Sequence, residues 1–340
     1  SKESIFSDLN HLTVVTSTSE MYADCFGFTE EEVFTALDEY GMQDKRDDVK
    51  RWYDGFTFGK CRDIYNPWSV INYLKTERLS TYWANTSSNG LVDKLIREGS
   101  AEIKTSMENL LKGEHLYKEI DEQIIFDQLD ADENAIWSLF LASGYLKAES
   151  YELNVDTGAD LYELALTNKE VQIMFQKMIR KWFTRSGTVY NGFIRALLQN
   201  DVKSMNAYMN RVALATFSYF DSGRNPSMET QPERFYHGFV LGLAVELADR
   251  YIITSNRESG FGRYDVMMEP KGEADNAVIM EFKVRDSSEE KSLEDTADAA
   301  LKQIEKQQYQ ADLESRGFPG DRIRKYGFAF EGKEVLIKSI

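Results

Sequence analysis

The spacing of apolar positions changes along the chain close to residue 233. Before that point, most segments have apolar residues at the three- and four-residue spacing of amphipathic helices. After it, several short segments have the composition and the two-residue period of strands. The pattern predicts a mostly helical N-terminal and middle part followed by a region of mixed helices and strands, so the expected fold class is α+β or α/β.

Residues 1–100 are predicted to be helical with loops. The segment TEEEVFTALDEYG starts a helix with Thr29 as its N-cap and Glu32 at the capping-box position. A further helix follows Asn66, with Pro67 in its first turn. The aromatic residues between these two helices are expected to pack a small helical subdomain.

Residues 101–230 are predicted to form a helical module with one hairpin. The hairpin is expected in residues 143–167, where apolar and polar residues alternate around the turn signal DTG. Helices that flank a hairpin are compatible with a winged-helix arrangement and also with an ordinary packing module, which we favour. Gly, Pro, Ser and Asn gather in residues 218–233, which we interpret as a domain boundary.

Residues 231–340 are predicted to contain a helix, three strands, a helix and one or two final strands. The first helix is apolar on most sides and therefore largely buried. The three strands are YIITSNRE, RYDVMMEP and AVIMEFKV, and a single long helix follows them until GFPG stops it. We expect a mixed sheet between helices, with the second and third strands as antiparallel neighbours.

Composition is that of a globular chain with more than one core. Its 340 residues are enough for two or three domains, and 42% of them are hydrophobic. Cys25 and Cys61 are too few for a disulfide framework, which favours a reducing, cytoplasmic setting. The chain has no run long enough to span a membrane and no signal-peptide core. Because it lacks an initiator methionine, we expect it to be part of a longer protein.

The charge of the chain argues against a broad surface for nucleic-acid phosphates. The net charge is −17, whereas nonspecific affinity for nucleic acids comes from lysine and arginine. The acidic excess is uneven, because residues 231–340 carry 16 basic and 21 acidic side chains and so contribute only −5. A local groove in this part of the chain is still compatible with the composition.

A set of charged residues in the second and third strands is a candidate metal site. Residues two apart in a strand share a face, so Glu281 and Lys283 lie on one side of AVIMEFKV and Phe282 on the other. Asp265 is in the preceding strand, where it can approach Glu281 across the pair. Two converging carboxylates suit Mg²⁺ or Mn²⁺. A fully solvated strand face would accommodate the same charges without any special role, whereas burial beneath a helix would require partners for them.

Metal-dependent hydrolysis of a phosphodiester would use these residue types. The reaction requires a positioned water, neutralisation of charge on the transition state and stabilisation of the leaving oxygen. Asp265 and Glu281 could hold the metal, and Lys283 could orient the water or help to deprotonate it. An aspartate followed after a gap by Glu-x-Lys is common on protein surfaces, so this pattern alone is weak support for a metal site. Its context adds support: the residues lie in a predicted hairpin, a buried helix precedes it, and a helix with Gln303 and Tyr309 follows it.

Nucleotide hydrolysis is not expected of this chain. A phosphate-binding loop of the form Gly-x-x-x-x-Gly-Lys-Ser/Thr does not occur in the sequence. The segment GFTFGKC has the wrong spacing and no hydroxyl residue after its lysine. We therefore expect this chain by itself neither to bind ATP tightly nor to hydrolyse it.

Several segments resemble a known family. Residues 233–340 resemble the PD-(D/E)xK nuclease domain at the C-terminal end of a group of bacterial AAA-type ATPase-like proteins, in the segments YHGFVLGL, SNRESGFGRYD, IMEFKV, ALKQIEKQQY and YGFAFEGKEV. The N-terminal part is similar to the region that follows the ATPase core of those proteins, in FGFTEEEV, WYDGFTFG, IYNPWSVINYL and YWANTSSNGLV. The middle is similar at SGYLKAES and TNKEV, so the resemblance covers nearly the whole chain.

The resemblance implies an αβββαβ nuclease core with a divalent metal, Mg²⁺ or Mn²⁺. It implies that Asp265, Glu281 and Lys283 are the acid, acid and lysine of the active site, and that Gln303 is the glutamine of the following helix. For the acid of the first helix, Glu233 is favoured over Glu246. Tyr264 replaces the proline of the motif, a common departure, and the ATPase core itself lies outside this chain.

The other titratable residues carry weaker indications. His11, His115 and His237 are scattered along the sequence and are not expected to form a catalytic triad or zinc site. Arg263 could pair with Glu258 or contact a phosphate, and the pair is the favoured interpretation.

Two functions of different classes follow from the sequence. The first is a metal-dependent nuclease acting on nucleic acid, with DNA favoured over RNA as the substrate, and working with the ATPase core of a longer protein. The alternative is an interaction or regulatory module with a nuclease fold and no activity. The acid and lysine set favours the first function, and the acidic surface favours the second.

Overall fold

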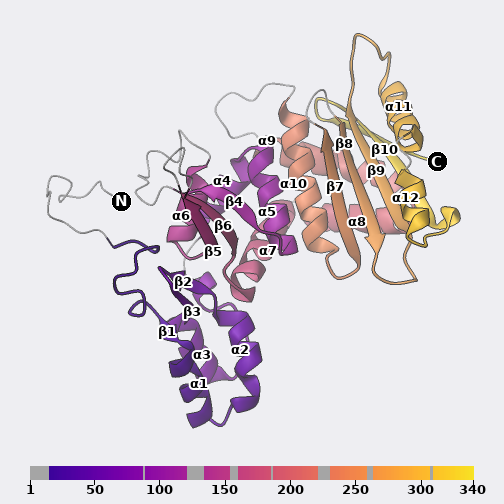
Figure 1. Ribbon diagram of the computed structural model, residues 1–340. Helices are drawn as coiled ribbons and strands as arrows, with labels where there is room; N and C mark the ends of the chain where they lie inside the picture. The colour runs from indigo at the N-terminus through magenta and orange to yellow at the C-terminus, as the bar shows by residue number, and fades with distance from the viewer. Residues whose placement is uncertain are drawn as a thin grey trace, which may run out of the picture. The chain divides into compact units, whose positions relative to one another are not determined.

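A computed structural model describes residues 15–86, 89–120, 134–153, 160–184, 187–220, 230–258, 263–306 and 309–340 (Figure 1). By its internal contacts the chain divides into two compact units. The first comprises Ser1–Gly99 and Ser106–Lys177, and the second comprises Ser100–Thr105 and Met178–Ile340. Within the described residues, no helix combines the length and the apolar composition that crossing a bilayer requires. The division into residues 1–100, 101–230 and 231–340 remains a prediction.

The N-terminal part of the first unit combines helices with a small sheet. Its elements are β1 (Phe28–Thr29), α1 (Glu30–Glu39), α2 (Arg46–Tyr53), β2 (Phe56–Phe58), β3 (Cys61–Tyr65) and α3 (Pro67–Thr76). The capping box predicted at Thr29 and Glu32 is present, because the Thr29 side chain accepts from the Glu32 backbone and the Glu32 side chain accepts from the Thr29 backbone. Asn66 caps α3 by accepting from the backbone N–H of Ser69, with Pro67 as the first helical residue.

A three-stranded sheet in the order β1-β3-β2 was not predicted from the sequence. Its strands are only two, five and three residues long, too short for a two-residue period to be recognised. Gly55 (φ +111°) turns the chain from α2 into β2, and a Cβ there would lie 2.0 Å from the carbonyl oxygen of Thr167. Both the positive φ and this close approach require glycine. The region is otherwise mostly helical, as expected.

The following segment contains the predicted hairpin. Its elements are α4 (Gly90–Glu98), α5 (Ala101–Lys112), β4 (Leu116–Glu119), α6 (Ala135–Ala142), β5 (Leu146–Leu153), β6 (Asp160–Leu166) and α7 (Lys169–Thr184). Strands β5 and β6 pair antiparallel as expected, and β4 adds a third strand in the order β4-β6-β5.

Helix α6 stands directly before this hairpin and is largely buried. Its sequence AIWSLFLA has no charged residue, and Ile136, Trp137 and Phe140 are each at most 2% exposed. A helix that reads a nucleic-acid groove needs polar side chains on an exposed face. The winged-helix arrangement remains a prediction, but α6 cannot serve as its recognition helix.

The second unit is built on a five-stranded mixed sheet. Its elements are α8 (Gly187–Gln199), α9 (Val202–Phe220), α10 (Thr230–Glu246), β7 (Tyr251–Glu258), β8 (Arg263–Pro270), β9 (Ala277–Val284), α11 (Leu293–Lys306), α12 (Tyr309–Ser315), β10 (Ile323–Glu331) and β11 (Glu334–Ser339). The strand order is β11-β10-β9-β8-β7, with β9 and β10 parallel and the other neighbours antiparallel. The predicted αβββαβ order and the antiparallel pairing of the second and third strands are confirmed.

The two faces of this sheet have different chemistry. On one face, the ring of Phe282 stacks on Phe328 at a centroid distance of 4.5 Å and meets Tyr236 of α10 edge-on at 4.9 Å. Phe193 of α8 meets Phe328 on the same face. The opposite face packs Ala277 and Ile279 of β9 against α11 and α12. Helices therefore cover both faces, so the charged residues of β9 do not lie on a fully solvated surface (Figure 1).

Two asparagines of α9 cover the outer edge of the sheet at β11. Asn206 donates to the carbonyl of Ile337 at 2.8 Å and accepts from its N–H at 2.8 Å. Asn210 does the same with Val335, at 2.6 and 2.9 Å. Asn206 and Asn210 are four residues apart, about 6 Å along the helix, and Val335 and Ile337 are two residues apart, about 6.8 Å along the strand. The two asparagines therefore match the spacing of their partners on β11. The edge strand is thereby protected from pairing with another chain.

Two predicted boundaries look different in the structure. The region expected as one helix from 292 to 317 is described as α11 and α12, and residues 307–308 between them lie outside the described residues. Most of the boundary expected in residues 218–233 also lies outside them, at 221–229.

Candidate active site on the five-stranded sheet

Asp265 and Glu281 lie directly opposite each other on neighbouring strands. Strands β8 and β9 pair antiparallel with Asp265 as the register partner of Glu281. Side chains at such positions leave the same face of the sheet, with Cβ atoms about 4.5–5.5 Å apart. Two carboxylates at this spacing can share one cation, and the approach of Asp265 to Glu281 across the strand pair is as expected from the sequence.

Glu281 is almost completely buried, with 1% of its surface exposed. Its parallel neighbour on β10 is Gly327, which leaves space for α11 to cross the sheet closely. A Cβ on Gly327 would lie 2.5 Å from the carbonyl oxygen of Ala297 and 3.2 Å from the Cβ of Ala300. The small residues on α11 and β10 thus bring the helix down beside Glu281. A carboxylate buried this deeply requires compensation by a cation or by hydrogen bonds.

Asp265 is held by tyrosines from two helices. The hydroxyl of Tyr309, the first residue of α12, donates to the Oδ2 atom of Asp265. The hydroxyl of Tyr236, from α10, donates to the backbone carbonyl of Asp265 at 2.9 Å. One tyrosine therefore contacts the carboxylate and the other fixes the strand that carries it.

A cavity of about 230 Å³ adjoins this carboxylate. Polar groups of β7, β8 and α12 line it together with apolar residues that include Ile279 of β9, and the polar lining comprises Thr254, Ser255, Asp265, Tyr309 and Asp312. The volume is sufficient for a metal ion with several waters. Asp265 is only partly buried, so a ligand in the cavity can reach it.

Lys283 lies on the same face as Glu281, two residues further along β9. Its register partner on β10 is Ala329, and its side chain is partly exposed. The distance along the strand between Glu281 and Lys283 is about 6.8 Å. Gln303 is half-buried on α11, one turn after Ala300, in the helix that covers this side of the sheet.

The two candidate acids of α10 occupy different positions on that helix. Glu233 precedes Tyr236 by three residues, so its position lies on the same helical face as the tyrosine that reaches Asp265. The side chain of Glu233 itself is outside the described residues. Glu246 is ten residues beyond Tyr236, about 15 Å along the axis, and pairs with Arg180 at 3.3 Å. Because α10 packs on the Phe282 face and Tyr236 reaches only the backbone of Asp265, the choice of Glu233 over Glu246 remains a prediction.

The donor set fits a hard divalent cation. Asp265 and Glu281 offer carboxylate oxygens, and Mg²⁺ is usually held by one or two carboxylates while it keeps several waters. Among the described residues, no group of three or more His, Cys, Asp or Glu side chains is placed to hold a metal. A site of two carboxylates completed by water and substrate oxygens is therefore the arrangement that these residues support.

Two further expectations concern residues elsewhere. His11 lies outside the described residues, and His237 is 3% exposed on α10 with its ring 5.2 Å from that of Tyr236. Glu258 and Arg263 are register partners at the ends of β7 and β8, but their side chains are outside the described residues.

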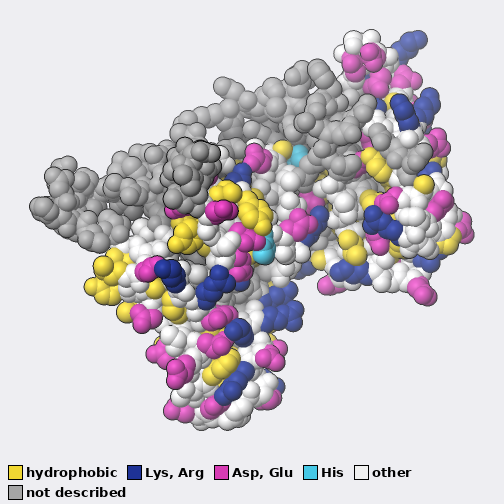
Figure 2. Space-filling view, in the orientation of Figure 1, with side chains coloured by type: hydrophobic (Ala, Val, Ile, Leu, Met, Phe, Trp, Pro, Cys, Tyr) yellow, Lys and Arg dark blue, Asp and Glu magenta, His cyan; other side chains and the backbone are white. Residues whose placement is uncertain are grey.

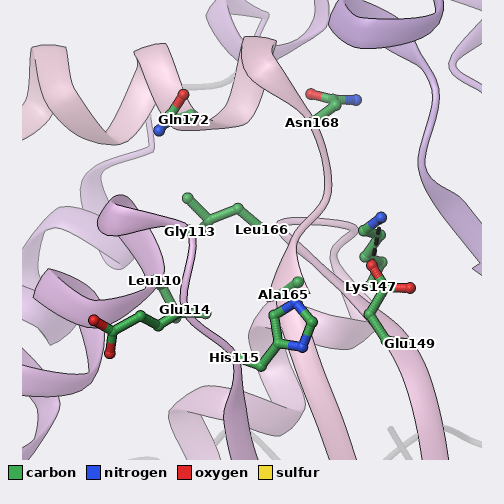
Figure 3. A pocket seen from close by; sticks show the side chains of 10 residues that line it. All are labelled: Leu110, Gly113, Glu114, His115, Lys147, Glu149, Ala165, Leu166, Asn168 and Gln172. Carbon is green, nitrogen blue, oxygen red and sulfur yellow. Dashed lines mark ion pairs between the residues drawn. The ribbon is translucent and has the colours of Figure 1, made fainter.

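A second hollow, of about 280 Å³, lies in the first unit (Figure 3). His115 at its rim is bonded through Nδ1 to Glu163 at 2.6 Å. Lys147 pairs with Glu149 at 2.6 Å, and Gln172 donates to the carbonyl of Leu111 at 3.1 Å. His115, Lys147 and Gln172 are thus engaged with the protein itself, and the hollow's two glutamates, Glu114 and Glu149, are not register partners on neighbouring strands as Asp265 and Glu281 are.

Surface charge agrees with a local rather than an extended binding site. Figure 2 shows acidic and basic side chains interspersed over the described parts of the visible face. Several cations of the second unit are paired, including Arg250 with Asp275 at 2.5 Å and Arg316 with Glu269 at 3.0 Å. Such paired charges contribute little to the attraction of phosphates.

The sequence named Tyr309 only as part of the helix after the strands and did not single out Tyr236, and no sequence pattern predicts the contacts that these two tyrosines make with Asp265. Tyr309 is 44 residues beyond Asp265 in the sequence, and its contact with Asp265 depends on how α12 packs. Tyr236 lies in a largely apolar helix, where a tyrosine is expected to fill the core, and only the structure shows its hydroxyl at β8.

Comparison with known proteins gives one family-model match, and it lies in the part of the chain that carries this sheet. The family model of the PD-(D/E)XK nuclease superfamily matches residues 231–340. Over 339 residues the chain is 23% identical to an uncharacterized protein in the vnfD 5' region of Azotobacter chroococcum mcd 1. The alignment covers 94% of this chain and 57% of that protein, so the chain spans little more than half of its length. No solved structure matches the chain significantly.

Proposed function

We propose that residues 231–340 form a metal-dependent nuclease that hydrolyses phosphodiester bonds of nucleic acid, with DNA as the expected substrate. The observation that carries the proposal is the opposition of Asp265 and Glu281 on β8 and β9, with Lys283 two residues further on the same face. The match to the nuclease superfamily covers the residues that carry this set.

Each residue has a defined part in the proposed reaction. Asp265 and Glu281 would hold Mg²⁺ or Mn²⁺, which when bound acidifies a coordinated water and neutralises charge on the phosphate. Lys283 would orient the attacking water and stabilise negative charge that develops on the phosphate oxygens. The water oxygen forms a bond to phosphorus and releases a proton to solvent while the bond to the leaving oxygen breaks, and the leaving oxygen takes a proton from solvent. Gln303 and Glu233 would support the site from α11 and α10.

The proposal extends to the setting of the enzyme. The resemblance of the N-terminal and middle segments to ATPase-like proteins supports an ATPase core elsewhere in the same longer protein as a partner. Cys25 and Cys61 are both free, which supports a reducing, cytoplasmic setting. These statements concern the biological context and do not affect the chemistry assigned to the sheet.

A cleavage assay with matched variants tests the proposed function. Single-stranded DNA, duplex DNA and RNA of equal length would be incubated with the purified chain and Mg²⁺, Mn²⁺ or a chelator. We expect metal-dependent cleavage of DNA that is lost in Asp265→Asn. Asp275→Asn is the control, because Asp275 belongs to the same unit, lies in the turn between β8 and β9 and pairs with Arg250 at 2.5 Å.

Two results would contradict the proposal. Cleavage that survives the chelator, or that is equal in the parent and Asp265→Asn, would place the activity elsewhere. Binding of nucleic acid or protein partners without any cleavage by the parent would favour the alternative function, an inactive nuclease fold used for interaction.

A further inference from the structure

Tyr309 acts directly on the proposed metal ligand Asp265. Its hydroxyl donates to Oδ2, and both residues line the cavity beside the carboxylate. The ring of Tyr309 packs against the apolar cluster formed by Ala277, Ile279, Leu301, Ile304, Leu313 and Ile323. This packing restricts the ring, so the hydroxyl is held at the carboxylate by the core of the sheet and its helices.

The hydrogen bond restricts how Asp265 can ligate a cation. A carboxylate oxygen that accepts from a phenol is a poorer second ligand for the same metal, and bidentate binding requires both oxygens to face the ion. While the Tyr309 bond persists, Asp265 is therefore limited to monodentate ligation through its other oxygen. The backbone of Asp265 is fixed as well, since its carbonyl accepts from Tyr236 at 2.9 Å.

Divalent cations differ in how much this restriction matters to them. Mg²⁺ requires near-octahedral geometry with ligands at about 2.0–2.1 Å and is served by monodentate carboxylates. Mn²⁺ suits the same carboxylate and water ligands. Ca²⁺ takes six to eight oxygens at about 2.3–2.6 Å and readily uses bidentate carboxylates. A site whose exposed carboxylate is kept monodentate discriminates against Ca²⁺.

We propose that Tyr309 is a positioning residue that holds Asp265 as a monodentate ligand and thereby makes the site selective for small octahedral cations over Ca²⁺. This inference rests on the proposed function, because it assumes that Asp265 binds the metal. It concerns metal selectivity and assigns Tyr309 no contact with substrate or with the reacting atoms.

The test compares Mn²⁺ and Ca²⁺ binding by calorimetry for the whole chain and for Tyr309→Phe. Removal of a group that orients a metal ligand typically weakens metal binding about 10- to 100-fold. We expect Mn²⁺ to bind about 10-fold more weakly to Tyr309→Phe, while the affinity for Ca²⁺ is unchanged or rises. The Mn²⁺/Ca²⁺ affinity ratio should therefore fall about 10-fold. A purely structural role of the hydroxyl would weaken both ions alike and leave the ratio unchanged.

Tyr326→Phe is the matched control. Tyr326 is also in the second unit, and its hydroxyl donates to Asn200 at 2.7 Å on the aromatic side of the sheet. This variant should keep the parental ratio, and thermal unfolding of both variants checks that the fold is retained. Because Phe differs from Tyr only by the hydroxyl, we expect Tyr309→Phe to fold.

The outcomes separate this inference from the proposed function. An unchanged ratio in Tyr309→Phe, with a parent that binds Mn²⁺ and cleaves, overturns the inference and leaves the nuclease assignment standing. A parent that binds neither ion overturns both. A fall in the ratio in Tyr326→Phe equal to that in Tyr309→Phe would also overturn the inference, since the effect would then be general to the unit.

Discussion

Two glutamates, one in each compact unit, are equally buried and differ in what surrounds them. Glu170 and Glu281 are each 1% exposed. In the first turn of α7, Glu170 accepts from the hydroxyl of Ser69 at 2.7 Å and from the backbone N–H of Ala84 at 3.2 Å. In β9, Glu281 faces Asp265 across the sheet, with Lys283 two residues away on the same face.

The difference shows that burial alone does not identify a functional carboxylate. Burial raises the pKa of Glu170, and the hydrogen bonds from Ser69 and Ala84 oppose that change by stabilising the charged form. Glu170 thus joins α3, α7 and the turn at Ala84 as a structural link. A second carboxylate opposite Glu281 would disfavour the charged pair unless a cation lies nearby, which is the condition expected of a metal site.

The largest expected effect comes from Glu281→Gln. The substitution removes a negative charge while it nearly preserves shape, so Mn²⁺ binding should weaken by more than the about 10- to 100-fold typical of an outer partner. Cleavage should fall with it, and the fold should be retained. Calorimetry, cleavage rates and thermal unfolding measure the three quantities. Unchanged binding and cleavage would mean that Glu281 resembles Glu170 in being purely structural.

Lys283→Ala should affect the reaction without affecting the metal. Loss of one group that stabilises the transition state lowers the rate about 10²-fold or more, while Mn²⁺ affinity should stay within about 3-fold of the parent. Lys338→Ala is the control, because Lys338 is on the same sheet and pairs with Asp298. Equal rates for the parent and Lys283→Ala would remove the lysine from the proposed mechanism.

Glu170→Gln should lower the stability of the protein and leave its metal binding and cleavage unchanged. An amide nitrogen in place of one carboxylate oxygen faces a donor, so the free energy of unfolding should fall by about 1–3 kcal/mol. Metal binding and cleavage per folded molecule should not change. Chemical denaturation of the parent, Glu170→Gln, Ser69→Ala and the double variant measures the coupling between the two side chains. Additive effects would show that the hydrogen bond seen at 2.7 Å does not stabilise the fold.

The smallest effect is expected at Asp54, a third buried carboxyl. Burial, together with neighbouring Asp63, raises the pKa of Asp54 to about 7. Because the pKa of Asp54 is higher in the folded state, the protonated carboxyl contributes to the free energy of unfolding. This contribution is complete below about pH 4 and is lost as the pH rises through 7. Between pH 5 and pH 8 the parent should lose at least about 1 kcal/mol of stability relative to Asp54→Asn. Parallel stability curves for the two proteins would contradict this expectation.

Much of the second unit could be predicted because its signals are local. The strand AVIMEFKV was predicted with the same bounds as β9, since its length, composition and flanking turns are read from neighbouring residues. The alternation along it correctly separated Glu281 from Phe282, because the side-chain period of a strand is a property of the backbone. The small sheet β1-β3-β2 could not be predicted, because its strands are too short for periodicity and, although β2 and β3 form a local hairpin, β1 joins β3 only through a contact distant in sequence.

By itself, the sequence determined the caps of α1 and α3, the order of elements in the nuclease-like part and the placement of Asp265 and Glu281 on adjacent strands. These depend on hydrogen bonds and periods within a few residues, or on the short connection that pairs β8 with β9. Only the tertiary structure decided that α11 crosses at Gly327 to bury Glu281 and that Tyr309 reaches Asp265. Such contacts join residues about 30 to 45 positions apart, and the packing of whole helices selects them, which no local pattern encodes.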